Sequence, residues 1–525
     1  MTLEISDAWD VVVVGSGMGG LTAAALLARL RRLRVVVLEQ HSTIGGFTHT
    51  FRRPGGWEWD VGVHYVGQMA EGTMPRRLMD AVTGGTVAWQ RLPEPFDRVH
   101  YPGLEATFGG DRQRLRSELV RLFPAEASAI DAYFADLARE ARRLMGALTE
   151  GELPRPLRWV GRRLGLLPDW SRTETCGAYL ERRFRDARLR SLLASFWGDW
   201  GVPPGLGAFP LHALIAEHYA DGAWYPKGGA SGIAKGAESV IAAAGGTMQR
   251  RHRVARVLIE NGRAVGVEAL TRRAGRDRTV TLRAPLVISD AGARNTYGLL
   301  PPDIGADPAA RLARHRDPLS ALSVYLGLNA SPAELGFNGE NVWIFEGFDH
   351  DLALDPTRWA GEPHPSVAYL SFASLRAGDG RPHTAEIITF LPASVVEPWR
   401  GRGGWRNRGT EYQAFKDRAA DALLAMVEQR YPGFGKLVAY REVSTPLSIE
   451  HFINSPGGSV YGLAGSAERY REVGLLGVRT PVPGLLLTGA DAYLPGVVGA
   501  MFGGAAAVGA VLGPLGFLRV MAAVR

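Results

Sequence analysis

The sequence predicts an α/β fold built on a doubly wound parallel sheet. Residues 11–14 form an uninterrupted β-branched run, a glycine-rich turn follows, and residues 21–30 and 34–38 have the patterns of a helix and a second strand. A continuous apolar run is typical of a parallel strand buried on both faces, and such strand–helix–strand units connect by right-handed crossovers. Further apolar runs at residues 285–290 and 484–488 indicate that distant segments complete the same sheet.

The composition limits the class of protein. A chain of 525 residues with 46% hydrophobic and 22% charged residues has enough apolar material for large cores, which excludes a disordered, collagen-like or coiled-coil protein. Cys176 is the only cysteine, so an internal disulfide, a Cys-rich zinc site, an iron–sulfur cluster and a Cys-x-x-Cys pair are excluded. We expect no metal centre and a reducing, intracellular compartment.

Charge and the terminal segments bear on partners and location. The net charge of +7 is spread along Arg-rich stretches without a dense basic tract, so we expect no nucleic-acid partner but retain an anionic membrane surface. Residues 1–10 carry three acidic residues and no apolar core of a targeting peptide, which favours the cytoplasm. Residues 492–518 contain no charged residue, but their glycines and prolines favour a buried helix over a membrane span.

The glycine-rich turn has the pattern of a dinucleotide-binding loop. It consists of Gly15, Ser16, Gly17, Met18, Gly19 and Gly20. The first glycine permits a tight turn, the second lets the backbone approach a pyrophosphate, and the last lets helix and strand pack closely. Glu39 closes the second strand, where a carboxylate can bind ribose hydroxyls, and Gln40 follows it. The sequence therefore predicts a bound dinucleotide.

The segments after Glu39 and near the C-terminus favour FAD as that dinucleotide. After Glu39 the chain runs to Gly45 and Gly46, whose backbone can lie against the longer FAD molecule. Near the C-terminus a strand leads to Gly489 and Asp491, and a new helix starts at residue 495 or 496. The N-terminus of that helix is suited to stabilise the charge of a reduced flavin, although an ordinary strand–turn–helix crossover is the alternative. The chain contains no second unit of this kind, so we expect no separate nicotinamide domain.

The remaining segments predict a second, interleaved domain. Residues 90–219 carry amphipathic helical patterns, as at 112–122 and 130–148, and residues 248–269 alternate around a turn at Asn261-Gly262. Several alternating strands between residues 319 and 394, such as 321–328 and 386–390, precede a helix near residues 412–431. We therefore predict an FAD-binding domain from residues 1–89, 225–300 and 445–525, a helical cap or substrate domain at 90–224, and a mainly β substrate domain at 301–444.

Further motifs are spread over nearly the whole chain. They are Leu38-Glu39-Gln40-His41, Gly45-Gly46 with His49-Thr50-Phe51, Asp60-Val61-Gly62-Val63-His64-Tyr65-Val66-Gly67, His212-Ala213-Leu214 with His218-Tyr219, Tyr225-Pro226-Lys227-Gly228-Gly229, Ser289-Asp290-Ala291-Gly292 with Asn295-Thr296-Tyr297, and the tail from Thr488-Gly489 to Gly504. With them the sequence resembles the carotenoid oxidoreductases, a family that includes phytoene desaturases, the carotenoid cis–trans isomerase and, most similar, the retinol saturases. It departs from the vertebrate members at Phe47-Thr48, where they have cysteines.

The resemblance implies a Rossmann-like FAD domain of the amine-oxidase type and a substrate domain around an apolar tunnel. In the family, the backbone at Val254 passes the adenine, Asp491 meets the diphosphate or ribityl chain, and Val498 and Met501 lie near the flavin. The implied FAD-binding set is Gly15, Ser16, Gly17, Met18, Gly19, Gly20, Glu39, Gln40, Gly45, Gly46, Phe47, Thr48, His64, Tyr65, Val254, Asp290, Ala291, Gly489, Asp491, Gly496, Val497, Val498 and Met501.

Three residues are candidates for proton transfer. His64 lies in the segment that the resemblance places near the flavin, which makes it the first candidate for a proton donor; a hydrogen-bonded structural histidine is the alternative. Glu217 and His218 form the second cluster together with Tyr219, and a helical pattern would bury only one or two of the three. For Glu217 a solvated surface charge is the more common role.

These observations predict an FAD-dependent oxidoreductase that saturates a C=C bond of a conjugated isoprenoid polyene. Desaturation and cis–trans isomerisation on the same scaffold, amine oxidation and a non-catalytic flavin carrier are the alternatives. An external electron donor or acceptor is required. A polyene is nearly insoluble in water, so we expect peripheral contact with the inner face of a membrane through the basic amphipathic stretch at residues 157–167, which otherwise forms an ordinary helix of the cap.

Overall fold

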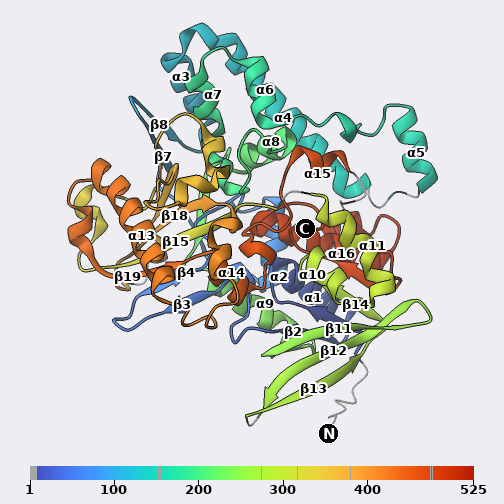
Figure 1. Ribbon diagram of the computed structural model, residues 1–525. Coiled ribbons are helices and arrows are strands. Elements are labelled where there is room, and N and C mark those ends of the chain that lie inside the picture. The colour runs from blue at the N-terminus through green and yellow to red at the C-terminus, as the bar shows by residue number, and fades with distance from the viewer. Residues whose placement is uncertain are drawn as a thin grey trace.

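A computed structural model describes residues 9–150, 153, 155–273, 275–315, 317–378, 380–472, 475 and 477–524 (Figure 1). A parallel sheet in the order β10-β2-β1-β14-β20 forms its base. The strands are β10 (Thr247–Arg250), β2 (Val35–Glu39), β1 (Val11–Val14), β14 (Leu286–Ser289) and β20 (Leu485–Leu487). The predicted doubly wound sheet is confirmed, and it joins segments from both ends of the chain.

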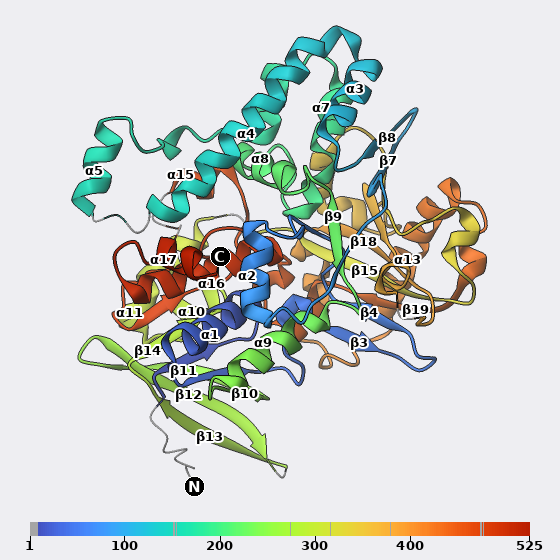
Figure 2. The same cartoon turned by 180° about the vertical axis from the view of Figure 1, so that it is seen from behind.

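The valines of β1 alternate between two hydrophobic cores. Val11 and Val13 pack toward helices α1 (Met18–Arg31), α9 (Ser231–Ala243) and α16 (Gly496–Leu512), whereas Val12 and Val14 pack against a β-meander. The meander consists of β11 (His252–Glu260), β12 (Arg263–Arg273) and β13 (Arg276–Arg283). Seen from behind in Figure 2, α1 and α9 lie beside α2 (Met74–Thr83), which they contact. Burial on both faces explains the uninterrupted β-branched run.

A second, seven-stranded sheet has the order β19-β15-β18-β17-β16-β7-β8. Its strands are β7 (Asp97–Tyr101), β8 (Leu104–Phe108), β15 (Ser320–Leu328), β16 (Asn341–Phe345), β17 (Val367–Ser371), β18 (Thr384–Leu391) and β19 (Val438–Ser444). Helix α13 (Thr410–Arg430) packs on one face of this sheet. Aromatic residues of the other face, such as Trp343 and Phe390, belong to the main core that includes α1.

Helices dominate the segment between β8 and residue 218. They are α3 (Arg112–Leu122), α4 (Ala127–Glu150), α5 (Arg155–Arg163), α6 (Cys176–Arg183), α7 (Ala187–Ala194) and α8 (Phe209–His218), and Figure 1 shows most of them above the two sheets. Small sheets formed by β3 (Thr50–Arg52) with β4 (Glu58–Asp60), and by β5 (Val66–Gly67), β9 (Ala223–Pro226) and β6 (Trp89–Arg91), connect the layers. The remaining short helices are α10 (Ala293–Gly298), α11 (Pro302–Ala313), α12 (Ala373–Ala377), α14 (Pro446–Ile453), α15 (Ala467–Arg471) and α17 (Gly516–Ala523).

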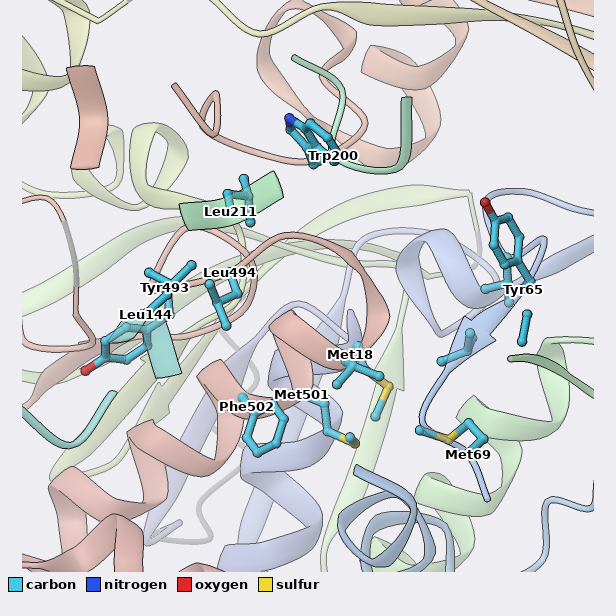
Figure 3. Packing of buried hydrophobic residues seen from close by; sticks show 14 of the residues in the cluster. Met18, Tyr65, Met69, Leu144, Trp200, Leu211, Tyr493, Leu494, Met501 and Phe502 are labelled. Atoms are coloured by element: carbon cyan, nitrogen blue, oxygen red, sulfur yellow. The ribbon is translucent and has the colours of Figure 1, made fainter. Parts of the chain in front are cut away.

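The uncharged C-terminal segment forms a buried helix. Small residues of α16 let it approach α1 closely: a Cβ on Gly504 would lie 2.5 Å from the carbonyl oxygen of Gly19. Figure 3 shows Met18 of α1 near Met501 and Phe502 of α16 in this packing. Among the described residues no single helix is long and apolar enough to cross a membrane; α16 and α17 pass that test only together, with a bend of 118° between them.

Two details differ from the expected pattern. Residues 247–250, expected in the meander, instead form β10 beside β2 at the edge of the parallel sheet. Residues 97–108, expected in the helical cap, form β7 and β8 of the second sheet. All three strands are short, and tertiary contacts rather than local pattern select the sheet that each one joins. The proposed domain limits stay a prediction. The expectation about a targeting peptide concerns residues 1–10, of which residues 1–8 lie outside the described part of the chain.

Candidate active site

One large cavity extends from the carboxyl ends of the parallel strands to the second sheet. Its volume is about 1570 Å³, which exceeds the roughly 300–1,000 Å³ of a pocket for one small ligand. At one end it is lined by residues 14–18 and by Glu39, and at the other by Trp343, Tyr369 and Phe390. Ligands of open α/β sheets bind at this edge of the strands. The cavity can therefore hold two molecules end to end, a dinucleotide and an apolar substrate.

The two ends of the chain meet at the glycine loop, defined as residues 15–20. A Cβ on Gly19 would lie 2.3 Å from the backbone nitrogen of Gly489, and a Cβ on Gly20 would lie 2.3 Å from the carbonyl oxygen of Gly15. Real Cβ atoms do not approach backbone atoms this closely, so Gly19 and Gly20 are required by packing. They lie behind the cavity surface, together with Gly489 and Met501, whereas Gly17 and Met18 line it.

Glu39 links the loop to the end of β2. Its Oε2 accepts hydrogen bonds from the backbone N–H of Ser16 at 3.0 Å and from the Ser16 hydroxyl at 2.6 Å. Its Oε1 accepts from the backbone N–H of His41 at 2.7 Å. These bonds fix the carboxylate on the cavity surface, and the lone pairs left on a carboxylate with three donors can accept hydroxyl groups. Glu39 thus has the position and the acceptors to bind ribose.

Asp290 follows the last residue of β14 and lies directly beneath the glycine loop. The backbone N–H groups of Gly17 and Gly20 face its carboxylate, and they stabilise the charged form. Burial has the larger effect and raises the pKa of Asp290 from 3.8 to about 7; the nearby charges of Glu39 and Asp491 act in the same direction. A neutral Asp290 removes one negative charge from the place where the sequence predicts a diphosphate.

We expect Asp290→Asn to flatten the dependence of stability on pH. A carboxyl whose pKa is raised in the folded state stabilises the fold while protonated, and this contribution is lost as the pH rises from about 4 to about 7. The melting temperature of the variant relative to wild type should therefore increase between pH 5 and pH 8, as measured by differential scanning calorimetry. The exposed Asp131→Asn serves as control, and parallel curves for Asp290→Asn and wild type would contradict the assignment.

Asp491 joins three segments at the flavin end of the predicted site. Its Oδ2 accepts from the backbone N–H of Ala293 at 2.7 Å, and its Oδ1 accepts from that of Leu463 at 2.6 Å. The buried guanidinium of Arg469 donates to the carbonyl oxygens of Asp491, at 2.8 Å, and of Leu463, at 2.9 Å. Residues 496–500, at the start of α16, line the cavity beside Asp491, and the helix has no side-chain N-cap.

The residues present fit a flavin dinucleotide. Thr488 lines the cavity with a buried hydroxyl that has no hydrogen-bond partner in the described structure, and the first turns of α1 and α16 both open on the same space. A ligand with several acceptor groups satisfies such donors. Of the predicted binding residues, the cavity lining contains Gly15, Ser16, Gly17, Met18, Glu39, Gln40, Gly45, Gly46, Phe47, Thr48, His64, Tyr65, Val254, Asp290, Ala291, Asp491, Gly496, Val497 and Val498.

The structure separates the three candidates for proton transfer. His64 lines the cavity, but burial and the Arg376 charge lower its pKa from 6.5 to about 3. His218 also lines it; its Nε2 accepts from the backbone N–H of Gly67 at 2.9 Å, and burial lowers its pKa to about 4. Glu217 lies outside the cavity lining, where it pairs with Arg112. Both histidines are therefore neutral, and Glu217 is not brought to the site.

Sequence reasoning missed a polar group in the apolar part of the cavity. The hydroxyl of Tyr65 lies between the carboxyl groups of Asp97 and Asp199, and Tyr219 and Tyr461 are nearby. Asp97 occupies a buried position of an otherwise alternating strand, and Asp199 stands in the aromatic sequence Trp197-Gly198-Asp199-Trp200. A charged residue at a buried strand position was the available signal.

Comparison with known proteins supports this architecture. A family model for an NAD(P)-binding Rossmann-like domain matches residues 13–82. The chain is 34% identical to all-trans-retinol 13,14-reductase of Danio rerio over 95% of this chain and 85% of that protein, and 30% identical to the inactive all-trans-retinol 13,14-reductase of the same fish over the same shares. It is 25% identical to prolycopene isomerase 2 of an Oncidium hybrid cultivar, over 98% and 86% of the two chains.

Solved structures share the fold at lower identity. An oxidoreductase from Methanosarcina mazei superposes with a TM-score of 0.63 at 17% identity, over 98% of this chain and 99% of that one. Putrescine oxidase superposes with a TM-score of 0.62 at 18% identity, over 96% and 99%. Fold and site together define a flavoprotein oxidoreductase with a Rossmann-like dinucleotide-binding domain. The chain belongs to the all-trans-retinol 13,14-reductase family, which confirms its resemblance to the carotenoid oxidoreductases.

Proposed function

We propose that the protein binds FAD non-covalently and saturates a C=C bond of a retinoid or carotenoid polyene with electrons from an external donor. The observation that carries this proposal is the single cavity that joins the dinucleotide site to an apolar, aromatic space. An enzyme that oxidises or reduces a carbon skeleton must place that skeleton next to its cofactor, and one continuous cavity does so.

The chain offers binding groups for each part of FAD. Glu39 accepts hydrogen bonds at the ribose end, the glycine loop presents backbone N–H groups to the diphosphate, and the first turn of α16 faces the flavin end. When bound, FAD supplies the exchange of a hydride with the substrate. Burial raises the pKa of Asp290 to about 7, which lessens the negative charge beneath the loop, where the diphosphate would bind.

The far part of the cavity suits a polyene. The apolar lining of the cavity as a whole includes Leu211, Leu214, Ile215, Tyr219, Trp343, Tyr369, Ile388, Phe390, Phe517 and Met521. A conjugated hydrocarbon offers no hydrogen bonds, so its affinity depends on burial, at about 25 cal/mol per Å² of apolar surface. A polyene that buries several hundred Å² in such a space gains enough free energy for tight binding.

Saturation is the direction that the relatives favour. The reductase of Danio rerio is 34% identical to this chain, whereas the prolycopene isomerase is 25% identical. A relative named as inactive is 30% identical, so identity alone does not establish turnover, and the reaction must be measured.

Mass spectrometry of one anaerobic incubation tests the proposal. Purified yellow protein is reduced with dithionite and mixed with all-trans-retinol, and the molecular mass of the extracted retinoid is measured. A gain of two hydrogens is expected. A loss of two hydrogens with oxidised flavin and an electron acceptor would establish desaturation instead, and a changed chromatographic peak without a mass change would establish isomerisation. Bleaching of oxidised flavin by putrescine would establish amine oxidation. Protein that binds flavin but leaves every one of these compounds unchanged would indicate a carrier.

We also propose that the polyene enters from an anionic membrane surface through α5 and α17. Large apolar side chains in α5 and just after it are exposed. The exposed fraction is 63% for Trp159, 66% for Leu164 and 74% for Leu166. In both overall views α5 projects from the body on the side of α11, where Figure 2 also shows α17 (Figures 1 and 2). Phe517 and Met521 of α17 line the cavity, while Leu515 and Leu518 are exposed. The sequence of α5 is rich in arginine, which complements anionic lipid.

Vesicle co-sedimentation measures this contact. The double variant Trp159→Glu/Leu164→Glu should lose at least about tenfold in binding to phosphatidylserine-containing vesicles, because it removes the apolar anchors. Gln113→Glu/Ser117→Glu on α3 adds the same charge at exposed positions and should bind nearly as wild type does. Equal loss in both double variants would show a purely electrostatic contact, and no binding by wild type would refute the proposal.

A further inference from the structure

The carboxyl groups of Asp97 and Asp199 share one tyrosine hydroxyl, that of Tyr65, in the otherwise apolar part of the cavity. The hydroxyl oxygen of Tyr65 lies 2.9 Å and 3.0 Å from the two carboxyl oxygens of Asp199, and 3.3 Å from Oδ2 of Asp97. Asp97 is 3% exposed and lies behind the lining, whereas Asp199 and Tyr65 are part of it. The three side chains thus form a line from the cavity into the protein.

A count of hydrogens shows that this line holds an extra proton. Tyr65 has one hydroxyl hydrogen and can donate it to only one of the two carboxyl groups. The second contact is a hydrogen bond only if the other carboxyl is protonated and donates to the Tyr65 oxygen. If both carboxyl groups were charged, only one of them could accept the Tyr65 hydrogen. The other would face the Tyr65 oxygen with no hydrogen between them, and the two negative charges would repel each other. At least one of Asp97 and Asp199 is therefore a neutral acid.

The surroundings favour the protonated form. The amide of Asn341 donates to Asp97 at 3.0 Å, and Arg376 is close enough to stabilise its charge, but burial outweighs both and raises the pKa of Asp97 to about 7. None of the groups that affect the pKa of Asp199 is a cation. Burial and the Asp97 charge raise this pKa well above 3.8.

No other described group near the pair changes its protonation close to neutral pH. The pKa values of Tyr65, Tyr219, Tyr369 and Tyr461 are raised above 10 by burial, and those of His64 and His218 are lowered to about 3 and about 4. The tyrosines stay protonated and the histidines stay neutral while the acids titrate.

Asp199 and Tyr65 also lie between the apolar part of the cavity and the part predicted to hold the flavin. On the substrate side, the ring of Tyr65 is 4.7 Å from that of Tyr219 between centroids, and both rings line the cavity. On the flavin side, Tyr461 faces Asp199 and precedes Gly462, which packs against Asp491. Asp199 therefore lies on the cavity surface between the apolar part and the residues predicted to hold the cofactor.

We propose that Asp199 protonates the polyene and that Asp97 reloads it through the hydroxyl of Tyr65. This inference rests on the proposed saturation and names its proton donor. As the hydride from reduced flavin bonds to one carbon of the double bond, the O–H bond of Asp199 breaks and its proton bonds to the adjacent carbon. The relay starts with both acids protonated, Asp97 donating to the Tyr65 oxygen and Tyr65 donating to Asp199. The Tyr65 proton then moves to Asp199, and the Asp97 proton moves to Tyr65. Asp97 is left as a carboxylate, which takes up a proton from water before the next turnover.

Infrared spectroscopy and single-turnover kinetics test this assignment together. The difference spectrum of wild type minus Asp97→Asn/Asp199→Asn should contain the C=O stretch of a buried protonated carboxyl, shifted in D2O; the band of Asp290, a buried acid that both proteins keep, cancels in this difference. With flavin content and retinol binding unchanged, Asp199→Asn should slow saturation by about 10²–10⁴-fold, the usual contribution of a general acid. Asp351→Asn removes an exposed carboxyl outside the cavity lining and should change neither result.

The two positioning residues have a separate signature. The rate of wild type should fall as the pH rises above about 7, because Asp97 then reloads the donor less often. Tyr65→Phe and Asp97→Asn should retain the first turnover but slow later ones, and Asp97→Asn should lose this pH limb. Saturation at the wild-type rate by Asp199→Asn, or a difference spectrum without a protonated carboxyl, would overturn the proton path while leaving the proposed function intact. A wild type that binds flavin and retinol but never forms the saturated product would overturn both.

Discussion

Gly19→Ala protein is expected to fold poorly and to be isolated without flavin. The new Cβ would lie 2.3 Å from the backbone nitrogen and 2.5 Å from the Cα of Gly489, and 2.6 Å from Oδ1 of Asp290. Gly489 belongs to the turn after β20, so its backbone cannot move aside like the end of a long side chain. Overpacking of this kind costs about 1–3 kcal/mol or more, and here it also separates the two chain ends that form the dinucleotide site.

Flavin absorbance per protein and the urea unfolding midpoint measure the two consequences. Gly232→Ala in α9 is the matched control, because a Cβ there meets no atom within 4 Å and alanine favours a helix over glycine by about 1 kcal/mol. The control should remain yellow and at least as stable as wild type. A yellow Gly19→Ala protein with an unchanged midpoint would show that α1 and the turn at Gly489 are not packed as described.

Much of the dinucleotide site could be predicted because its constraints are local. The glycine loop between a strand and a helix and the small-residue helix at the C-terminus require particular residues for steric reasons, and the acidic residue at the end of the next strand is required for hydrogen bonding. The same logic explains α16: its lack of charge, which by length alone suggests a membrane span, reflects the close approach of Gly504 to the backbone of Gly19.

The acid–base residues could not be predicted in this way, because burial and partners come from distant segments. Glu217 follows a helical pattern, and only the fold shows that it pairs with Arg112 outside the cavity. Asp97 and Asp199 are 102 positions apart in the sequence, and they meet only because Tyr65 reaches both. The assignment of β10 to the parallel sheet likewise depends on its neighbour β2 and not on its own four residues.

Asp491→Ala is expected to lower the free energy of unfolding by about 2–6 kcal/mol. The substitution removes the acceptor of two buried backbone N–H groups, those of Ala293 and Leu463, and each unsatisfied donor costs about 1–3 kcal/mol. We expect a large loss of stability because the Asp491 carboxylate joins the start of α10, the segment around residue 463 and the strand–helix connection at the C-terminus. Asp491→Asn should lie between alanine and wild type, since its amide keeps one acceptor oxygen but places an NH2 group against the other N–H.

The same variants decide how Asp491 contributes to flavin binding. If it acts by joining the three segments, flavin retention and the urea midpoint should decline together along the series from wild type through asparagine to alanine, because Gly462 and Leu463 line the cavity and lose their support. The exposed Asp131→Ala should change neither property. A variant that keeps the wild-type midpoint but loses flavin would instead show that the carboxylate contacts the cofactor directly, as the family resemblance implies, and that the two backbone N–H groups find other partners.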